Sequence, residues 1–384
     1  MDNKIYRLVN WKENMDVDCS HLEQLENYFI DRLCDTKAVM MNGHNYGLLP
    51  PFGENKVSSR FEISEQLTGK VEIKLRSCNA ITGGGCRISY NPGQSNFLLY
   101  THTFSEEKES QSKGNGFWDV ILTVDPFKRI PTGIPDGEET PPRHPDTTEY
   151  YGLTIAPQGQ VNKEQLGMFH LVIGRIRQNG NRYEVDTQYI PPCVSMSSHP
   201  DLLDYYERFG SYLNDIERAS KIIISKTREG TRNSPLATHI GNVCEDLMRY
   251  IASIYFAYRN TGRTAAPVEI VGYFSTLAHT CFISLNFISR TQREELLKYF
   301  YEWSDVTPGS FEELLANSLN VIYEHGNIRT IMLQIESFLR VMGELWLKLS
   351  SLEYIGQHKE NIVISERTNQ TDAPKVKSGW TILD

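Results

Sequence analysis

The pattern of apolar and polar positions changes its period near the middle of the chain. Before Pro191-Pro192, apolar residues alternate with polar ones, as at Val71, Ile73 and Leu75, and this is the period of a strand with one buried face. After the prolines, apolar residues recur at intervals of four and three, which is the period of a helix. Two consecutive prolines also remove two backbone donors, so strand pairing is expected to end there.

Several short runs in the first half have the composition of strands. We expect strands over residues 5–11, 71–75, 87–90, 97–104, 117–124, 150–156, 168–178 and 182–189. The turn Gln178-Asn179-Gly180-Asn181 is typical of a type I′ hairpin. A short helix is predicted from a capping box at Ser20 and Glu23. Many short strands with turn residues between them predict an antiparallel β-sandwich or a barrel.

The second half opens with a long apolar stripe. After a predicted N-cap at Ser198 and a helix start at Pro200, with Ser220 in one gap, the stripe comprises Leu202, Tyr206, Phe209, Leu213, Ile216 and Ile223. A heptad spacing kept over three repeats fits a seam between helices of neighbouring subunits, and we predict a trimer seam here. An ordinary amphipathic helix on its own core has the same period, so periodicity alone leaves both interpretations open.

Further helices are predicted after this one. They start at Ser234-Pro235, Pro267, 294 and 311, and the last begins after Asn327 and ends near Leu352. These helices predict a bundle, so the fold class is α+β: a β-sandwich over 1–195, a helical bundle over 196–352 and a polar tail over 353–384. The tail ends in Trp380, Ile382 and Leu383, which suits either a strand added to a partner's sheet edge or a chance apolar terminus.

Composition restricts the possible partners. The chain has 39 Lys and Arg against 48 Asp and Glu, for a net charge of −9, so no broad basic surface is expected and nucleic acid is not predicted as a partner. No apolar run approaches the roughly 18 residues of a membrane span, and the first residues lack the apolar core of a signal peptide. The sequence predicts a soluble cytoplasmic protein that does not insert into the membrane. The seven cysteines show no CxxC pairing and suggest no disulfide framework.

Candidate chemical motifs are weak. The glycine-rich run 82–86 lacks the Gly-Lys-Ser/Thr ending of a phosphate-binding loop, and Cys19 with His21 has no second pair at metal-ligand spacing. Carboxylates at 136–139 lie in a proline-rich segment, 125–148, which is expected to be an extended loop: either an arm along a partner or a solvated connection. No catalytic, cofactor or metal residues are assigned, and the sequence favours assembly over catalysis.

Short motifs in order along the chain resemble the TssK family, baseplate subunits of the type VI secretion system. The opening motif of the family matches at Trp11, Glu13, Met15 and His21, whereas Asn14 replaces its glycine, Asp16 its phenylalanine and Cys19-Ser20 its Pro-Gln pair. Later segments similar to the family are Tyr46-Gly47-Leu48, Tyr189-Ile190-Pro191-Pro192-Cys193, Asp201-Leu202 and Pro267-Val268-Glu269. The resemblance covers roughly residues 1–325.

The resemblance implies a β-sandwich shoulder like that of phage receptor-binding proteins, a helical neck, a homotrimer and no enzymatic activity. It also implies that the N-terminal face, with a buried Trp11 and a hydrogen-bonded His21, binds the wedge proteins TssF and TssG. The family's C-terminal head contacts the envelope complex at the inner membrane. The chain after Tyr323 offers one helix and a polar tail, so an atypical anchor is expected at the inner face of the cell envelope.

Two other interpretations remain open at the level of sequence. One is an adaptor or receptor-binding protein of a phage tail or another contractile particle, built on the same shoulder and neck. The other is a β-sandwich carbohydrate-active enzyme with a helical appendage, which the lack of a convergent carboxylate pair disfavours. An elongated trimer would favour assembly, and a monomer with a deep acidic cleft would favour the enzyme.

Overall fold

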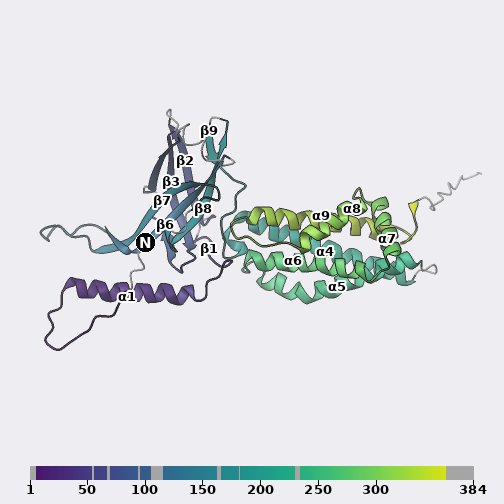
Figure 1. The fold of residues 1–384 in the computed structure, drawn as a ribbon, viewed down its shortest axis with the longest axis horizontal. Coiled ribbons are helices and arrows are strands. Elements are labelled where there is room, and N and C mark those ends of the chain that lie inside the picture. The colour runs from purple at the N-terminus through teal and green to yellow at the C-terminus, as the bar shows by residue number, and fades with distance from the viewer. Residues whose placement is uncertain are drawn as a thin grey trace, which may run out of the picture.

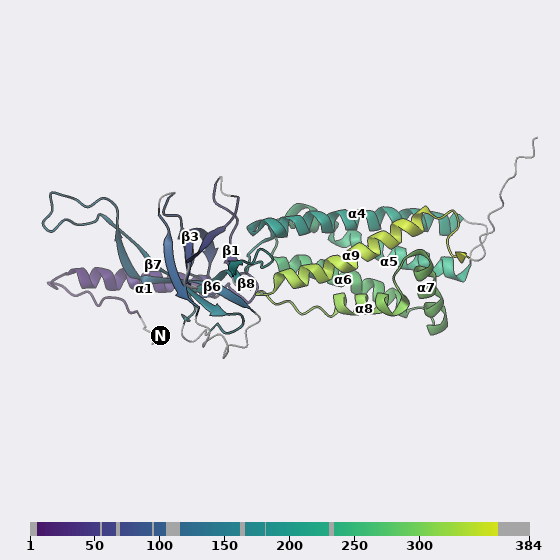
Figure 2. The same ribbon diagram turned by 90° about the horizontal axis from the view of Figure 1, so that it is seen from above.

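The chain folds into a sheet region and a helical bundle that extends away from it (Figure 1). This computed structural model describes residues 6–53, 56–66, 70–93, 96–104, 116–161, 166–180, 182–229 and 234–359. Seen from above, the bundle continues the long axis of the molecule, and the sheets lie at the opposite end (Figure 2). The fold is therefore mixed, with antiparallel sheets and a C-terminal helical region, as the change of period predicted.

Two antiparallel sheets form the first half. The first contains β1 (Gly47–Leu48), β2 (Ser59–Gln66), β3 (Lys70–Ile81), β4 (Arg87–Tyr90) and β5 (Leu98–Thr103), all paired with β3. The second has the order β7 (Asp146–Pro157), β6 (Phe117–Thr132), β8 (His170–Asn179), β9 (Arg182–Val185). The predicted hairpin turn does connect β8 to β9, where Asn179 pairs with Arg182.

Aromatic side chains join the two sheets. The ring of Phe104, just after β5, lies 4.9 Å from that of Trp118 in β6 and 4.0 Å from that of Tyr183 in β9, between centroids. A Cβ at Gly174 of β8 would lie 2.2 Å from the ring of Phe61 in β2, so only glycine allows this approach. The alternating residues of β3, Val71, Ile73 and Leu75, are fully buried, as predicted.

The helical half begins after a short 3₁₀ turn at Met196–Ser198. It contains α4 (Pro200–Glu229), α5 (Pro235–Thr261), α6 (Pro267–Asn286), α7 (Arg290–Trp303), α8 (Pro308–Leu319) and α9 (Ile328–Ser351). Proline at the first position of a helix loses no hydrogen bond, which explains why four of these helices start at proline. Ser234 caps α5 as predicted, its hydroxyl accepting from the Ala237 N–H.

Three local predictions are wrong. Residues 6–11 form no strand, and β9 ends at Val185 instead of continuing to 189. Pairing also does not end at the two prolines, because the Leu48 N–H donates to the Pro192 carbonyl at 2.7 Å and the Val194 N–H donates to the Leu48 carbonyl at 2.9 Å. A proline cannot donate, but its carbonyl still accepts.

The first helix, α1 (Cys19–Ala38), starts one residue before the predicted cap. Its N-cap is Asp18, whose carboxylate accepts from the His21 N–H, while the His21 ring accepts from the Asp18 N–H. The capping box therefore uses Asp18 and His21 instead of Ser20 and Glu23. A carboxylate at this position is also favoured by the partial positive charge of the helix N-terminus.

Only the middle of the proline-rich segment 125–148, residues 133–145, is the loop that was expected, because both of its ends lie in strands. Strands β6 and β7 continue into it, with Asp125 opposite Tyr150 and, after a bulge, Arg129 opposite Glu149 through to Thr132 opposite Asp146. Pro126 lies in the bulge and Pro131 lies beyond the part of β6 that also pairs with β8, and both are places where a strand tolerates proline; the other prolines lie in the loop. We call residues 125–150 the arm, and Figure 1 shows it projecting from the sheets beside α1.

Candidate functional site

The connection between sheets and bundle is held by a tightly packed backbone crossing. Gly47 has a φ of +117°, and a Cβ there would lie 2.1 Å from the Pro192 carbonyl oxygen. The Ser58 hydroxyl donates to the Ser198 carbonyl at 3.0 Å. Glycine is required at 47 both for the dihedral angle and for the space, so the segment before α4 is fixed directly against the first sheet.

A buried histidine joins the end of the bundle to the same place. His325 is 5% exposed, its Nε2 donates to the Tyr46 carbonyl at 2.7 Å, and its Nδ1 lies 3.0 Å from the Tyr323 hydroxyl. Since a carbonyl only accepts, the proton sits on Nε2, and Nδ1 accepts from the tyrosine. Burial lowers the pKa of His325, with His44 adding to the effect. The neutral ring is therefore the form that fits this junction.

Arg329 of α9 makes a third link. Its Nε donates to the Gln188 carbonyl at 2.8 Å, its guanidinium pairs with Asp201 of α4, and it lies 5.6 Å from the centroid of the Tyr205 ring. One side chain on α9 thus contacts both the end of the sheet region and α4. The junction is built for fixed geometry between the two halves of the molecule.

The predicted trimer seam on α4 lies inside the bundle of its own chain. Leu202, Phe209, Leu213, Ile216 and Ile223 are at most 1% exposed, and Tyr206 is 8% exposed. Ser220, in the gap of the stripe, is fully buried and accepts a hydrogen bond from the Trp346 indole at 2.9 Å. The seam prediction is therefore wrong: α9 and α5 already cover this face, so it cannot face another subunit.

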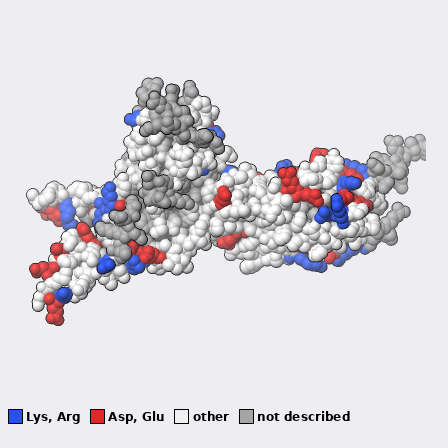
Figure 3. Space-filling model, in the orientation of Figure 1, with Lys and Arg blue, Asp and Glu red and all other residues white. Residues whose placement is uncertain are grey.

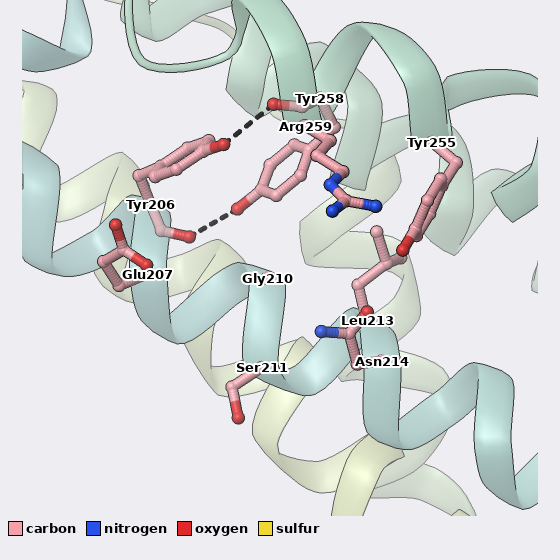
Figure 4. Close-up of a pocket in the computed structure, with 9 residues that line it drawn as sticks. All are labelled: Tyr206, Glu207, Gly210, Ser211, Leu213, Asn214, Tyr255, Tyr258 and Arg259. Atoms are coloured by element: carbon pink, nitrogen blue, oxygen red, sulfur yellow. Dashed lines mark hydrogen bonds between the residues drawn. The ribbon is translucent and has the colours of Figure 1, made fainter.

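A groove of about 530 Å³ opens on the outer side of α4 and α5 (Figure 4). At one end the Tyr206 hydroxyl donates to the Tyr258 carbonyl at 2.9 Å, and the Tyr258 hydroxyl donates back to the Tyr206 carbonyl. This reciprocal pair clamps the two helices together. The lining contains neither histidine nor cysteine, and its one carboxylate, Glu207, is paired with Arg263, so no unpaired base among the lining residues is available to activate Ser211. Catalysis finds no support in this groove.

The strongest candidate for a functional surface lies at the other end of the molecule. Helix α1 is 20 residues long, yet Cys34 is its one buried residue. Leu22, Phe29 and Leu33 lie on its surface at 51, 54 and 59% exposure. A helix normally gains its stability by burying an apolar face. No described part of the chain covers this face, and large exposed apolar patches mark binding sites.

The arm supports α1 from the side. Arg129 donates to Glu26 at 2.9 Å and to Asn27 at 3.0 Å, both on α1. Tyr6, ahead of α1, stacks on Phe127 of the arm with centroids 4.4 Å apart. These contacts hold α1 beside the arm with its apolar face outward. We call α1, residues 6–18 and the arm the N-terminal platform.

The four predicted motif residues lie on this platform. Trp11 is 48% exposed, so the prediction of a buried ring is wrong; it lies 6.2 Å from the His21 ring. His21 is hydrogen-bonded, at the start of α1. Glu13 is exposed and Met15 partly buried. Residues 6–11, which include Trp11, form no strand, so the indole is not held in a sheet and lies at the surface.

The platform is acidic. Residues 12–38 carry seven carboxylates and three cations, which leaves four negative charges uncompensated. Figure 3 shows acidic atoms at the outer end of α1. An apolar stripe bordered by carboxylates favours a partner with an apolar surface bordered by Lys and Arg.

The beginning of the tail is more ordered than expected. The Gly356 N–H donates to the Tyr299 hydroxyl at 3.1 Å, and the Lys359 N–H donates to Glu302 at 3.1 Å, both on α7. The predicted docking residues Trp380, Ile382 and Leu383 lie outside the described residues.

Within the described ranges no group of three or more His, Cys, Asp or Glu residues is placed to hold a metal ion. One described helix, α6, is long and apolar enough to cross a membrane, and 44% of its most apolar stretch is buried inside the bundle. Core helices of bundles meet the same criteria, so its length and composition do not identify a membrane span.

Comparison with solved structures places this architecture. A crystal structure of TssK aligns with 88% of this chain and 69% of its own, at a TM-score of 0.53 and 14% identity. The chain has the TssK fold. A structure of the TssK-TssF-TssG baseplate subcomplex aligns with 89% of this chain and 99% of its own, at 12% identity and a TM-score of 0.48. A structure of the type VI secretion system baseplate complex aligns with 88% of this chain and 100% of its own, at 15% identity and a TM-score of 0.49. The fold assignment rests on the first match. No family model and no curated protein matches the sequence.

Proposed function

We propose that this chain is a non-enzymatic structural subunit of a type VI secretion system baseplate. It would act as a trimeric adaptor between wedge proteins and the cell-envelope anchor, on the cytoplasmic side of the envelope. The observation that carries the proposal is the TssK fold over 88% of the chain, because the sequence motifs and the three-dimensional architecture point to the same family independently. In this proposal, 1–195 is a β-sandwich shoulder, 196–352 the neck and 353–384 the tail.

The N-terminal platform is the proposed contact with the wedge proteins, which would be similar to TssF and TssG. The uncovered stripe of Leu22, Phe29 and Leu33 supports this assignment, together with the exposed Trp11. The acidic border would select the orientation and speed the encounter, whereas the apolar stripe would supply most of the affinity. The rigid junction would then transmit the position of the shoulder to the neck.

Co-purification with wedge proteins similar to TssF and TssG tests the proposal. Replacing Phe29 and Leu33 by Ser should weaken capture of the wedge proteins about 100-fold, since each large apolar anchor contributes about 1 to 2 kcal/mol or more at an interface. Leu333→Ser on α9 is the matched control, because Leu333 is 48% exposed on the bundle. Equal capture by both variants would remove the platform assignment, and no capture by the unmodified chain would remove the baseplate role.

The tail is the proposed link to the envelope anchor, on the evidence of Trp380, Ile382 and Leu383 in the sequence. Deletion of residues 379–384 should leave trimer formation and the melting temperature unchanged and weaken recovery of envelope proteins in a pull-down. If the truncated chain recovers the same envelope proteins in the same amounts, the anchor lies elsewhere.

A further inference from the structure

Two cysteines meet where α1 packs on the first sheet. Cys34 is the one buried residue of α1, and Cys86 ends the turn 82–86 that leads from β3 into β4. The two residues are 8% and 4% exposed and belong to the same hydrophobic core. Their thiols form a hydrogen bond with each other. Because the two cysteines come from separate segments, this contact between thiols exists only in the folded protein.

The backbone fixes both residues in this contact. Gly85 has a φ of +78°, and a Cβ there would lie 2.7 Å from the Cys34 carbonyl oxygen, so the turn lies directly against α1. The turn is closed on itself, because the Thr82 N–H donates to the Cys86 carbonyl at 2.9 Å and the Thr82 hydroxyl accepts from the Cys86 N–H at 3.1 Å. Two cysteines can be bridged without backbone movement only when their side chains point toward each other at short range. The hydrogen bond between the thiols shows that these two do.

The two thiols differ in how readily they lose a proton. The hydrogen bond with Cys86 lowers the pKa of Cys34, and the nearby ammonium of Lys37 adds to the effect, whereas burial, Asp31 and Asp35 oppose it. The hydrogen bond with Cys34, together with burial, raises the pKa of Cys86. The thiolate is the nucleophile in disulfide chemistry. Cys34 is therefore the thiol that reacts first, and Cys86 is the neighbour that completes the bond.

The other cysteines have different surroundings. Cys19 is exposed at the start of α1, and its thiol donates to a carboxylate oxygen of Glu23 at 3.8 Å, so its contact is with an oxygen and not with a second sulfur. The remaining four are at most 1% exposed, and burial raises the pKa of each: Cys78, Cys193, Cys244 and Cys281. Cys34 differs from these four both in its pKa and in its thiol partner.

Small oxidants reach this pair when α1 moves away from the sheet. Helix α1 buries one residue, and Arg129 holds it to the arm through hydrogen bonds to Glu26 and Asn27. A segment with few buried contacts opens at a low cost in free energy. Opening exposes both thiols to small molecules, and closing brings the thiols back together.

We propose that Cys34 and Cys86 are a modification site, at which a reversible disulfide bond joins α1 to the first sheet. The oxidant is a small disulfide molecule. The Cys34 thiolate attacks one sulfur of this molecule, which forms a mixed disulfide and releases one small thiolate. The Cys86 thiolate then attacks the Cys34 sulfur, which forms the protein disulfide and releases the second small thiolate. The two protons of the cysteines end on the two released thiols, and the oxidant gains the two electrons that the protein loses.

The bond restrains α1 without covering its exposed apolar stripe. Cys34 packs against the sheet, whereas Leu22, Phe29 and Leu33 lie at the surface. Disulfides in reducing compartments are usually transient and respond to oxidants, so the site fits a reversible lock and not a permanent cross-link. The inference uses only this chain and its own cysteines, and it therefore does not depend on the proposed baseplate role.

Mass spectrometry of the oxidised chain tests the proposal. The folded full chain, in a Cys19→Ser background that removes the exposed thiol, is equilibrated at neutral pH with excess oxidised glutathione. Free thiols are then blocked with N-ethylmaleimide in denaturant. Two fewer thiols should be blocked than in the reduced chain, and a tryptic digest should contain residues 33–37 joined to residues 77–87. The second peptide also carries Cys78, so the Cys78→Ala variant must give the same cross-link.

Single replacements decide whether the pair is specific. Cys34→Ala and Cys86→Ala should each abolish the cross-link, whereas Cys281→Ala, the matched control at another buried cysteine, should keep it. Free thiols at 34 and 86 after equilibration, or a disulfide that joins either one to a different cysteine, would overturn the proposal. A mixed disulfide with glutathione that persists on Cys34 would overturn it as well, because Cys86 would then fail to complete the bond. Far-UV circular dichroism checks that each variant remains folded.

Hydrogen exchange measures whether the bond restrains α1. Amides of residues 33–38 should exchange at least about 10-fold more slowly in the bridged chain than in the reduced chain, because exchange there requires α1 to open. Dithiothreitol should restore the faster rate, and in Cys86→Ala the oxidant should leave the rate unchanged. Equal exchange in the bridged and reduced chains would show that the bond does not lock α1 to the sheet, and the proposed lock would be wrong.

Discussion

Helices α1 and α4 both carry apolar side chains at intervals of three and four, yet the structure uses them in opposite ways. On α4 the stripe is covered by α5 and α9 of the same chain, down to a fully buried Phe209. On α1 the stripe is uncovered, with Phe29 at 54% exposure. The period of apolar residues in the sequence predicts which side chains share a helix face. Which elements cover that face is seen only in the folded structure. The difference in exposure between the two stripes therefore depends on α5 and α9, which cover α4 and do not cover α1.

The largest expected effect comes from truncating the same residue type on each helix. Phe209→Ala should lower the free energy of unfolding by about 3 to 5 kcal/mol, because it leaves a cavity in the bundle. Phe29→Ala should lower it by less than about 1 kcal/mol, because the ring is half in water already. Urea unfolding followed by circular dichroism measures both. Similar losses would mean that the two stripes are covered alike.

The junction sharpens the comparison, because it fixes the segment before α4, whereas α1 is held mainly by the arm. Gly47→Ala should destabilise the chain by about 1 to 3 kcal/mol, or displace the 191–193 segment, since φ is +117° and the Pro192 oxygen occupies the Cβ position. Gly43→Ala is the control, as a Cβ there meets nothing within 4 Å. Thermal melting compares the two variants. Equal melting temperatures would show that the backbone crossing at Gly47 tolerates a side chain.

The pH dependence of stability should report on the buried His325 at the same junction. Burial lowers the pKa of His325 below the value of about 6.5 for a free imidazole. The unfolded chain then binds more protons than the folded chain between the two pKa values, so stability is complete above about pH 6.5 and falls as the pH drops below it. The groups that face the ring are His44, Tyr46 and Tyr323.

His325→Gln should flatten this acid limb of the stability curve, and His144→Gln, in the exposed arm, should leave it unchanged. Burial also lowers the pKa of His199, which accounts for a slope that remains in the variant. Chemical unfolding at a series of pH values from 5 to 8 gives the two curves. An acid limb that is identical in His325→Gln and the unmodified chain would show that the junction does not exclude the charged ring.

The smallest expected effect belongs to Trp11. Since the indole is 48% exposed, Trp11→Ala should change the free energy of unfolding by no more than about 0.5 kcal/mol, while weakening capture of the wedge proteins. Thermal melting and the pull-down separate the two. A large loss of stability with capture unchanged would make Trp11 a structural residue after all.

Much of the fold follows from local signals in the sequence. Ser234-Pro235 and Pro267 start helices where predicted, because capping and proline act within one turn. The strand β2 (Ser59–Gln66) was missed although Phe61 and Ile63 alternate with polar residues, since a short half-exposed strand differs little from a loop without its partner β3. The strand pairing at the two ends of the arm was missed because prolines signal a loop unless a pairing partner and a bulge are known.

The candidate sites were harder to predict. The motif residues Trp11 and His21 do mark the platform, but the exposure of Trp11 depends on a strand that does not form. The role of the α4 stripe depends on α9, more than 100 residues later in the sequence.

The central claim is that the exposed apolar stripe of α1 binds a partner protein, whereas the stripe of α4 is buried within its own chain. Hydrogen exchange with mass spectrometry tests this claim most directly. In the free chain, amides of 19–38 should exchange quickly and those of 205–223 slowly, because protection follows burial and packing. After addition of the wedge proteins, 19–38 should become protected by at least about 10-fold, with 205–223 unchanged. Slow exchange of α1 in the free chain, or protection appearing only outside the N-terminal platform, would contradict the account.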